Sequence, residues 1–120
     1  MVELTDEMKQ ELVTFQSLQQ QLAILQSQRQ QMQMQVMELE KALEEVGKSG
    51  TDSGFFRAVG GVLVPKNKAA LDKDLKEEKE GLTLRSGVFE KQEQKLKERL
   101  DSIRKKFEAL EKGAPAGKQK

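Results

Sequence analysis

The chain has 120 residues, of which 36% are hydrophobic, 34% charged and only 4% aromatic, and it contains neither Cys nor His. This composition is too poor in apolar residues for an ordinary compact core, and it excludes disulfides, thiol chemistry, His-dependent catalysis and the usual zinc sites. The formal net charge of +1 makes no overall electrostatic case for binding nucleic acid or a membrane.

Residues 5–47 carry the heptad pattern of a coiled coil. Ten of the twelve a and d positions between Met8 and Val46 are apolar, which predicts one long amphipathic helix. Thr5 is expected to cap its start, and Gly47 to mark its end. Eleven Gln lie between residues 10 and 35. Because the heptad runs through them, we interpret these Gln as the solvated face of the helix rather than as a disordered tract.

Residues 55–65 are expected to form a β-hairpin, because two β-branched and aromatic runs flank the two-residue turn signal Gly60-Gly61. This turn pairs Val59 with Val62, and Pro65 is expected to end the second strand because it has no N–H to donate. An isolated hairpin is marginal in water, and this one is apolar on both faces. We therefore assign it to assembly with other copies through a larger sheet or barrel. The assembly residues are Phe55, Phe56, Val59, Val62, Leu63 and Val64.

Residues 66–112 are predicted to form a second long helix with an uneven seam. An unbroken seven-residue apolar stripe runs through Leu75, Leu82, Phe89, Leu96, Ile103 and Leu110. The companion stripe is polar at its first four positions and apolar only at Leu100 and Phe107. Gly81 and Gly87 lie inside the helix, where each costs up to about 1 kcal/mol relative to Ala. Residues 113–120 are predicted to be a disordered tail.

Opposite charges favour packing of the two helices on each other. Residues 1–47 hold three Lys/Arg and eight Asp/Glu, whereas residues 66–112 hold fourteen and eleven. The predicted fold is mainly α: a long antiparallel coiled-coil hairpin, with the β-hairpin at its bend, in one domain over residues 1–112. We expect an alignment of the two helices in which the sequence numbers of two facing residues add up to about 118.

The predicted alignment leaves surplus apolar surface where the first helix begins and the second ends. Glu11 meets Phe107 there, so the ring lacks an apolar partner, and Leu12 adds an apolar group off the seam. We expect this open end to bind a partner through weak apolar contacts. The candidate residues are Met8, Leu12, Phe15, Ile103, Phe107 and Leu110.

No arrangement of residues points to catalysis. Acidic pairs such as Glu77-Glu78 lie among lysines, where they form i,i+4 ion pairs, and Gly60-Gly61 lacks the spacing and the Lys of a phosphate loop. We therefore expect no enzyme activity and no cofactor or metal. No apolar run is long enough to span a membrane or to act as a secretory signal, which favours a cytoplasmic protein.

The order of these features resembles the β-type subunits of prefoldin, most closely the archaeal ones. The resemblance covers nearly the whole chain. It rests on the Gln-rich segment 15–21, the hairpin 56–64 with its single turn, and the segments 73–77 and 82–85. The single hairpin separates it from α-type subunits, which carry two. The sequence departs from the family pattern at Gly61, where a polar turn residue is frequent, and at Pro65.

The resemblance implies a function that the residues alone do not. Subunits of this kind assemble as two α and four β chains into a hexamer whose hairpins form a β-barrel platform. The coiled coils project from the platform, hold non-native polypeptides at their tips without ATP, and deliver them to a group II chaperonin.

Two other functions compete with this interpretation. A structural scaffold or tether would use the coiled coil as a rod and would never hold a client. Such a rod should bury its seam evenly to the end, whereas here apolar residues concentrate at the open end. A nucleic-acid-binding arm would need a basic patch with aromatic residues, but the basic residues of the second helix are interleaved with acidic ones.

Overall fold

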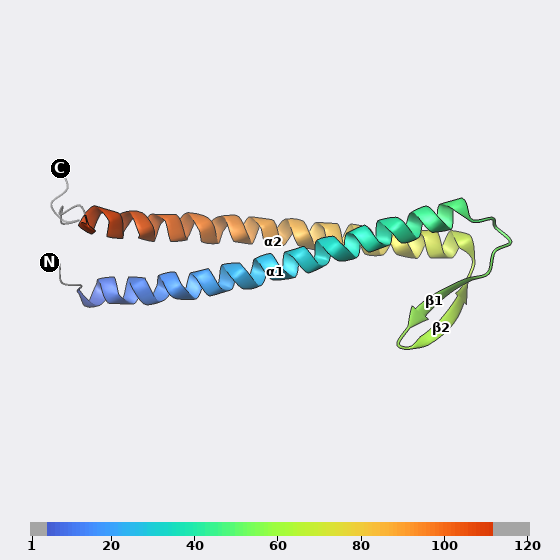
Figure 1. Cartoon of the computed structure of the whole chain (residues 1–120), viewed down its shortest axis with the longest axis horizontal. Coiled ribbons are helices and arrows are strands. Elements are labelled where there is room, and N and C mark those ends of the chain that lie inside the picture. The colour runs from blue at the N-terminus through green and yellow to red at the C-terminus, as the bar shows by residue number, and fades with distance from the viewer. Residues whose placement is uncertain (1–4, 112–120) are drawn as a thin grey trace. The chain divides into compact units, whose positions relative to one another are not determined.

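The computed structural model describes residues 5–111 and contains two long helices, which one β-hairpin connects along the chain (Figure 1). Helix α1 spans Asp6–Lys48 and helix α2 spans Lys68–Glu111, while strands β1 and β2 span Phe55–Val59 and Val62–Lys66. The mainly α fold class with a single β-hairpin is thereby confirmed. The predicted tail 113–120 lies outside the described residues, and its disorder stays a prediction.

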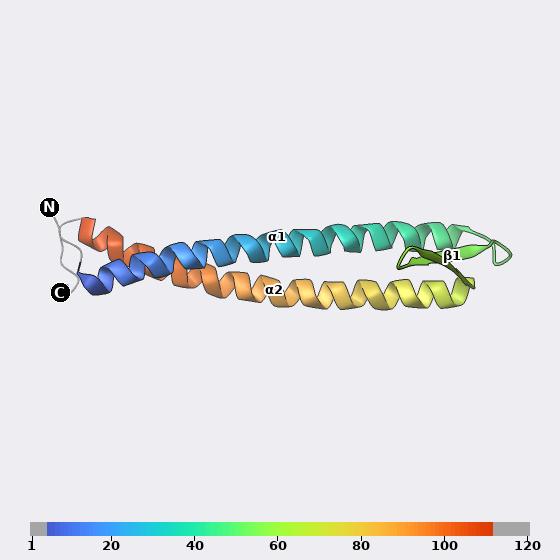
Figure 2. The same ribbon diagram turned by 90° about the horizontal axis from the view of Figure 1, so that it is seen from below.

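The chain divides into two compact units, each built from both helices. Unit 1 comprises Met1–Gln28 with Phe89–Lys120, and unit 2 comprises Arg29–Val88 and therefore contains the hairpin. The start of α1 pairs with the end of α2 in unit 1, and the end of α1 pairs with the start of α2 in unit 2 (Figure 2).

Helix α1 begins at the cap that its sequence predicts. The Met8 amide donates to the Thr5 hydroxyl oxygen at 3.1 Å, and the Lys9 amide donates to the Thr5 carbonyl at 2.9 Å. The first bond satisfies an amide that has no partner inside the helix, and the second is the first regular bond of the helix. At the other end the helix continues through Gly47 to Lys48, and the Ser49 hydroxyl donates to the carbonyl of Glu45 at 2.9 Å.

Helix α2 begins at Lys68, after a cap that the sequence interpretation overlooked. The side-chain oxygen of Asn67 accepts the Ala70 amide at 2.7 Å, and its carbonyl accepts the Leu71 amide at 3.0 Å. Asn is among the best capping residues because its side-chain oxygen replaces a missing intrahelical acceptor. Lys66, expected in the helix, instead belongs to β2.

The two strands pair antiparallel through the predicted turn. Val59 lies opposite Val62, and Gly60 and Gly61 have φ values of 55° and 82°. A two-residue turn with positive φ at both positions matches the right-handed twist of the strands, and glycine adopts it without strain.

The expectation that Pro65 ends the second strand is wrong, because β2 continues through it to Lys66. Pro65 lies opposite Phe56. Hydrogen-bonded and non-hydrogen-bonded pairs alternate from the pair that closes the turn, so the Phe56–Pro65 pair needs no N–H from Pro65. Proline is tolerated at such a position in an edge strand.

The core of unit 2 lies where the helices meet the hairpin. Val46, Leu71 and Leu75 are buried together, and burial of each such side chain is worth about 1.5–3 kcal/mol. The half-buried residues packed against them are Leu39, Ala42, Leu43 and Phe55. Leu71 lies outside the predicted stripe, but it is four residues before Leu75 and therefore faces the same core.

The observed cross-helix ion pairs agree with the predicted alignment. In unit 2, Lys79 contacts Glu40 at 3.1 Å. In unit 1, Lys106 contacts Glu11 at 2.7 Å. In both ion pairs the two residue numbers add up to within one of about 118, as the predicted alignment requires.

The seam of unit 1 mixes apolar and polar residues. Leu18 and Ile103 are 4% and 5% exposed, and Glu93 is buried as well, at 3%. Glu93 belongs to the stripe that the sequence shows to be polar. A charged group in a coiled-coil seam favours one register over its alternatives, at a cost in stability.

Candidate functional site

One face of the hairpin is exposed throughout. Phe56 is 58% exposed and Leu63 67%, and Ala58 and Pro65 on the same face are exposed too. Val59 and Val62, next to the turn, point to the opposite side of the hairpin but are also exposed, at 55% and 62%. Figure 1 shows the hairpin folded back beside α2 rather than extended beyond it. The exposed side of the hairpin, which carries Phe56, Ala58, Leu63 and Pro65, is the surface that we call the hairpin face.

The opposite side of the hairpin is held against α2. Arg57 forms an ion pair with Glu78, and Lys66 contacts Asp74 at 3.3 Å. Phe55 packs on the core of unit 2. These three contacts alternate along the strands with the residues of the hairpin face, because successive strand residues point to opposite sides.

The six predicted assembly residues thus fall into two groups. Phe56, Val59, Val62 and Leu63 are exposed, whereas Phe55 and Val64 are half-buried within their own chain. The sequence shows that the hairpin is apolar on both sides. The packing of Phe55 on the core and the ion pairs to α2 determine which side remains free.

The predicted partner-binding residues meet in unit 1, where α1 begins and α2 ends; we call this region the tip. Leu12 is 40% exposed, and Met8, Phe15, Phe107 and Leu110 are half-buried. Ile103 is buried at 5% exposure. Its side chain therefore belongs to the helix seam and not to the accessible surface of the tip.

Val13 is an exposed tip residue that the sequence interpretation missed. It is 65% exposed and follows Leu12 directly. The heptad pattern places Val13 far from the seam, where a polar residue is usual. The sequence feature that could have identified Val13 is an apolar residue at a heptad position that faces away from the seam.

Ion pairs surround the apolar residues of the tip. Arg104 bridges Asp101 and Glu108 on α2, and Lys105 also contacts Asp101, at 3.2 Å. The hydrogen bond from Arg104 lowers the pKa of Asp101, helped by Lys105. Across the helices, the hydrogen bond to Glu11 raises the pKa of Lys106.

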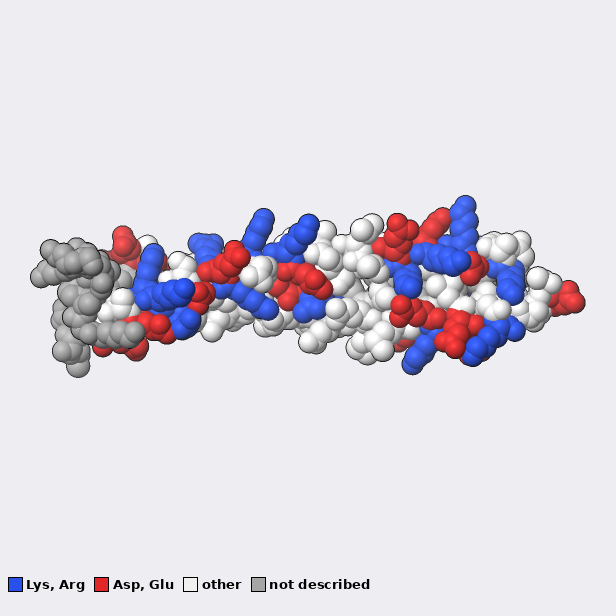
Figure 3. Space-filling model, turned by 90° about the horizontal axis from the view of Figure 1, so that it is seen from above, with Lys and Arg blue, Asp and Glu red and all other residues white. Residues whose placement is uncertain are grey.

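Basic and acidic side chains are interleaved in Figure 3, which is unlike a nucleic-acid-binding patch.

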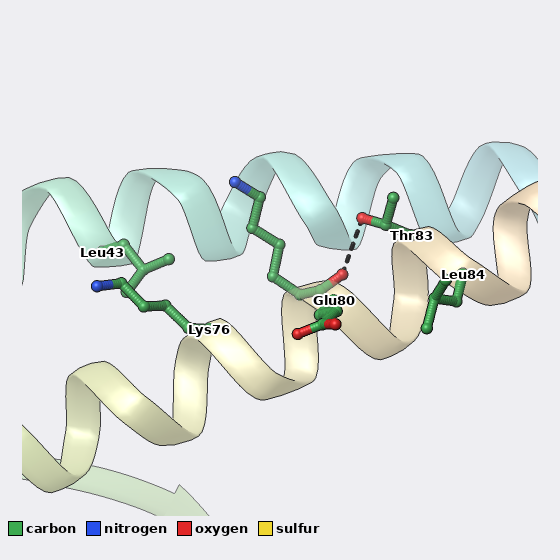
Figure 4. Close-up of a pocket in the computed structure, with 6 residues that line it drawn as sticks. Leu43, Lys76, Glu80, Thr83 and Leu84 are labelled. Carbon is green, nitrogen blue, oxygen red and sulfur yellow. Dashed lines mark hydrogen bonds between the residues drawn. The ribbon is translucent and has the colours of Figure 1, made fainter.

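A shallow groove in unit 2 lies between α1 and α2. Figure 4 shows Leu43 of α1 beside Lys76, Glu80, Thr83 and Leu84 of α2. The Thr83 hydroxyl donates to the carbonyl of Lys79 at 2.9 Å, as intrahelical back-bonding. Nothing in this groove pairs a nucleophile with a base.

Residues 5–111 contain no cluster of three or more acidic, His or Cys side chains that could hold a metal ion. No helix within the described part of the chain is both long and apolar enough to cross a membrane.

Comparisons with known proteins agree with the geometry of the helices and hairpin. The family model described as prefoldin subunit matches residues 9–114. The chain is 34% identical to the prefoldin subunit beta of Saccharolobus islandicus, covering 97% of this chain and 93% of the relative. It is 34% identical to that of Archaeoglobus fulgidus, covering 92% and 95%. The crystal structure of the prefoldin beta subunit from Thermococcus strain KS-1 superposes with a TM-score of 0.82 at 30% identity, covering 92% and 96% of the two chains.

Proposed function

Because the chain belongs to the prefoldin subunit family, we propose that it holds non-native polypeptides at its tip without ATP and delivers them to a group II chaperonin. Family membership itself makes the chain a prefoldin chaperone subunit. The observation that supports client binding at the tip is the apolar surface left after the helices pair. Leu12 and Val13 are 40% and 65% exposed there. We place this activity in the cytoplasm.

The hairpin face, together with Val59 and Val62 next to the turn, is the proposed assembly surface. Four apolar side chains more than half exposed are a liability on a lone two-stranded sheet, because its edges and its face can pair with other chains. Pairing with the hairpins of an α-type subunit and of other β copies would cover them. We propose an α2β4 hexamer with a β-barrel platform, as the family resemblance implies.

Client binding at the tip needs no chemistry. Each apolar side chain contributes a weak, non-directional contact, and flexible Met8 adapts to varied partners. Several tips in one assembly bind the same client with an avidity that a single tip lacks. Ile103, which is buried, contributes by holding the helices together beneath the exposed residues.

The test of tip binding is the double substitution Phe107→Ser with Leu110→Ser. We expect an intact assembly and weaker suppression of aggregation of a chemically denatured client, measured by light scattering. Leu84→Ser with Val88→Ser is the matched control, since these α2 residues are 65% and 52% exposed but lie in unit 2. If the tip variant protects the client as well as the control does, the tip assignment is wrong.

The test of assembly is Leu63→Asp, with Leu84→Asp as its control. The two leucines are 67% and 65% exposed, so neither substitution buries a charge within the chain. We expect monomers or dimers for Leu63→Asp and a wild-type mass for Leu84→Asp, measured by analytical ultracentrifugation with an α-type partner. An undisturbed complex of the Leu63→Asp chain would refute the hairpin face as the assembly surface.

The rival function is a scaffold that uses the coiled coil as a tether. A scaffold predicts normal assembly but no protection of any denatured client by the wild-type complex. The exposure of Leu12 and Val13 favours client binding, because a tether gains nothing from apolar side chains in water at its tip.

A further inference from the structure

From Leu12 to Gln28, the outward face of α1 in unit 1 carries no charge. Helix α1 has no charged residue from Leu12 to Gln28, whereas 13 of the 23 residues of α2 in this unit (89–111) are charged. The side of a coiled-coil helix that faces water is normally its most highly charged part. Solvation alone therefore does not account for the composition of this face.

The outward face combines isolated apolar side chains with amides and hydroxyls. It comprises Val13, Gln16, Ser17, Gln20, Ile24 and Ser27, all of them exposed. Val13 and Ile24 are 65% and 57% exposed. Within residues 5–111, the side-chain amides of Gln16 and Gln20 make no hydrogen bond to another protein group. Each amide offers two donors and an acceptor, so it can bond with either polar group of a peptide backbone.

The face is continuous with the tip. Val13 adjoins Leu12, and it lines a shallow hollow together with Lys9, Gln10 and Thr14. A chain bound at the tip can therefore extend along α1 without crossing a charged strip, since the next charge on the helix is Arg29.

We infer that the outward face of α1 is a second contact surface for the client, and that it takes extended stretches with few charged residues. This inference rests on the proposed function. A non-native chain exposes backbone N–H and C=O groups that lack secondary-structure partners, and the Gln amides bond with them while Val13 and Ile24 contact its apolar side chains. An uncharged face repels neither acidic nor basic clients, so it does not select between them.

The test places charges on this face. Gln16→Glu with Gln20→Glu adds two negative charges on side chains of the same shape, and Gln16→Lys with Gln20→Lys adds two positive charges on longer side chains. The matched control is Gln92→Glu with Gln94→Glu, which makes the same isosteric change at exposed positions of α2 in the same unit. Each full-length chain is assembled with an α-type partner. The clients are reduced α-lactalbumin, which is acidic, and denatured lysozyme, which is basic.

Wild type and control should protect both clients at similar molar ratios. The Glu variant should need about threefold more protein to protect the acidic client, and the Lys variant about threefold more for the basic one, since each like-charge contact opposes binding by a modest amount. Circular dichroism and native mass should stay unchanged.

Equal protection of both clients by all variants would overturn the inference while leaving the tip assignment intact. A changed native mass would overturn it too, because the face would then contact a second copy of the chain. Failure of the wild type to protect either client would instead refute the proposed function, and this inference with it.

Discussion

Replacement of Gly81 by Ala in the middle of α2 should stabilise the chain. An added Cβ there would meet no atom within 4 Å, and the φ of Gly81 is not positive. The substitution therefore introduces neither a clash nor strain, and it removes a glycine penalty of about 1 kcal/mol in a helix interior. For a chain of this size, 1 kcal/mol corresponds to a rise of about 4 °C in Tm.

The assay is thermal unfolding of the chain by circular dichroism, with Gly61→Ala as the contrasting variant. Gly61 has φ +82° in the hairpin turn, where a side chain is strained whatever the space around it. The same chemical change should therefore lower the free energy of unfolding there by about 1 kcal/mol. A Tm of Gly81→Ala at or below that of the wild type would refute the reasoning, because no contact in the structure requires glycine at this position.

Two further predictions concern the helix cap and the tip ion pair. Asn67→Ala should destabilise the chain by about 1 kcal/mol, because the Ala70 amide loses its acceptor, whereas Asn67→Asp should retain most of the stability; equal denaturant midpoints would contradict the cap. Lys106 has a pKa raised above its ordinary 10.5 by Glu11, so the stability from this pair is complete below pH 10.5 and is lost as the pH rises through the raised pKa. The Tm advantage of wild type over Glu11→Gln should therefore shrink in alkaline buffer, and an advantage that grows with pH would contradict the pairing.

The heptad pattern and the hairpin turn could be predicted from the sequence because each depends only on residues close together in the chain. Thr5 caps α1, and Gly60-Gly61 forms the turn that the sequence predicts. The seven-residue spacing marks the seam of each helix but leaves the register between the helices open, and the ion pairs of Glu11 and Glu40 agree with the register that we expected. These features need only residue type and separation along the chain, which the sequence contains in full.

The exposure of individual apolar side chains depends instead on contacts between segments that are far apart in the sequence. Phe55 packs on the core of unit 2, and Arg57 and Lys66 pair with Glu78 and Asp74. These contacts leave the other side of the hairpin facing outward. At the tip, packing of the two helices buries Ile103, which the sequence analysis assigned to the partner-binding surface, and leaves Val13 in water. Periodicity predicts on which face of a helix or strand a residue lies. Whether that residue is buried depends on the segment that packs against the face, and only the tertiary structure shows which segment does so.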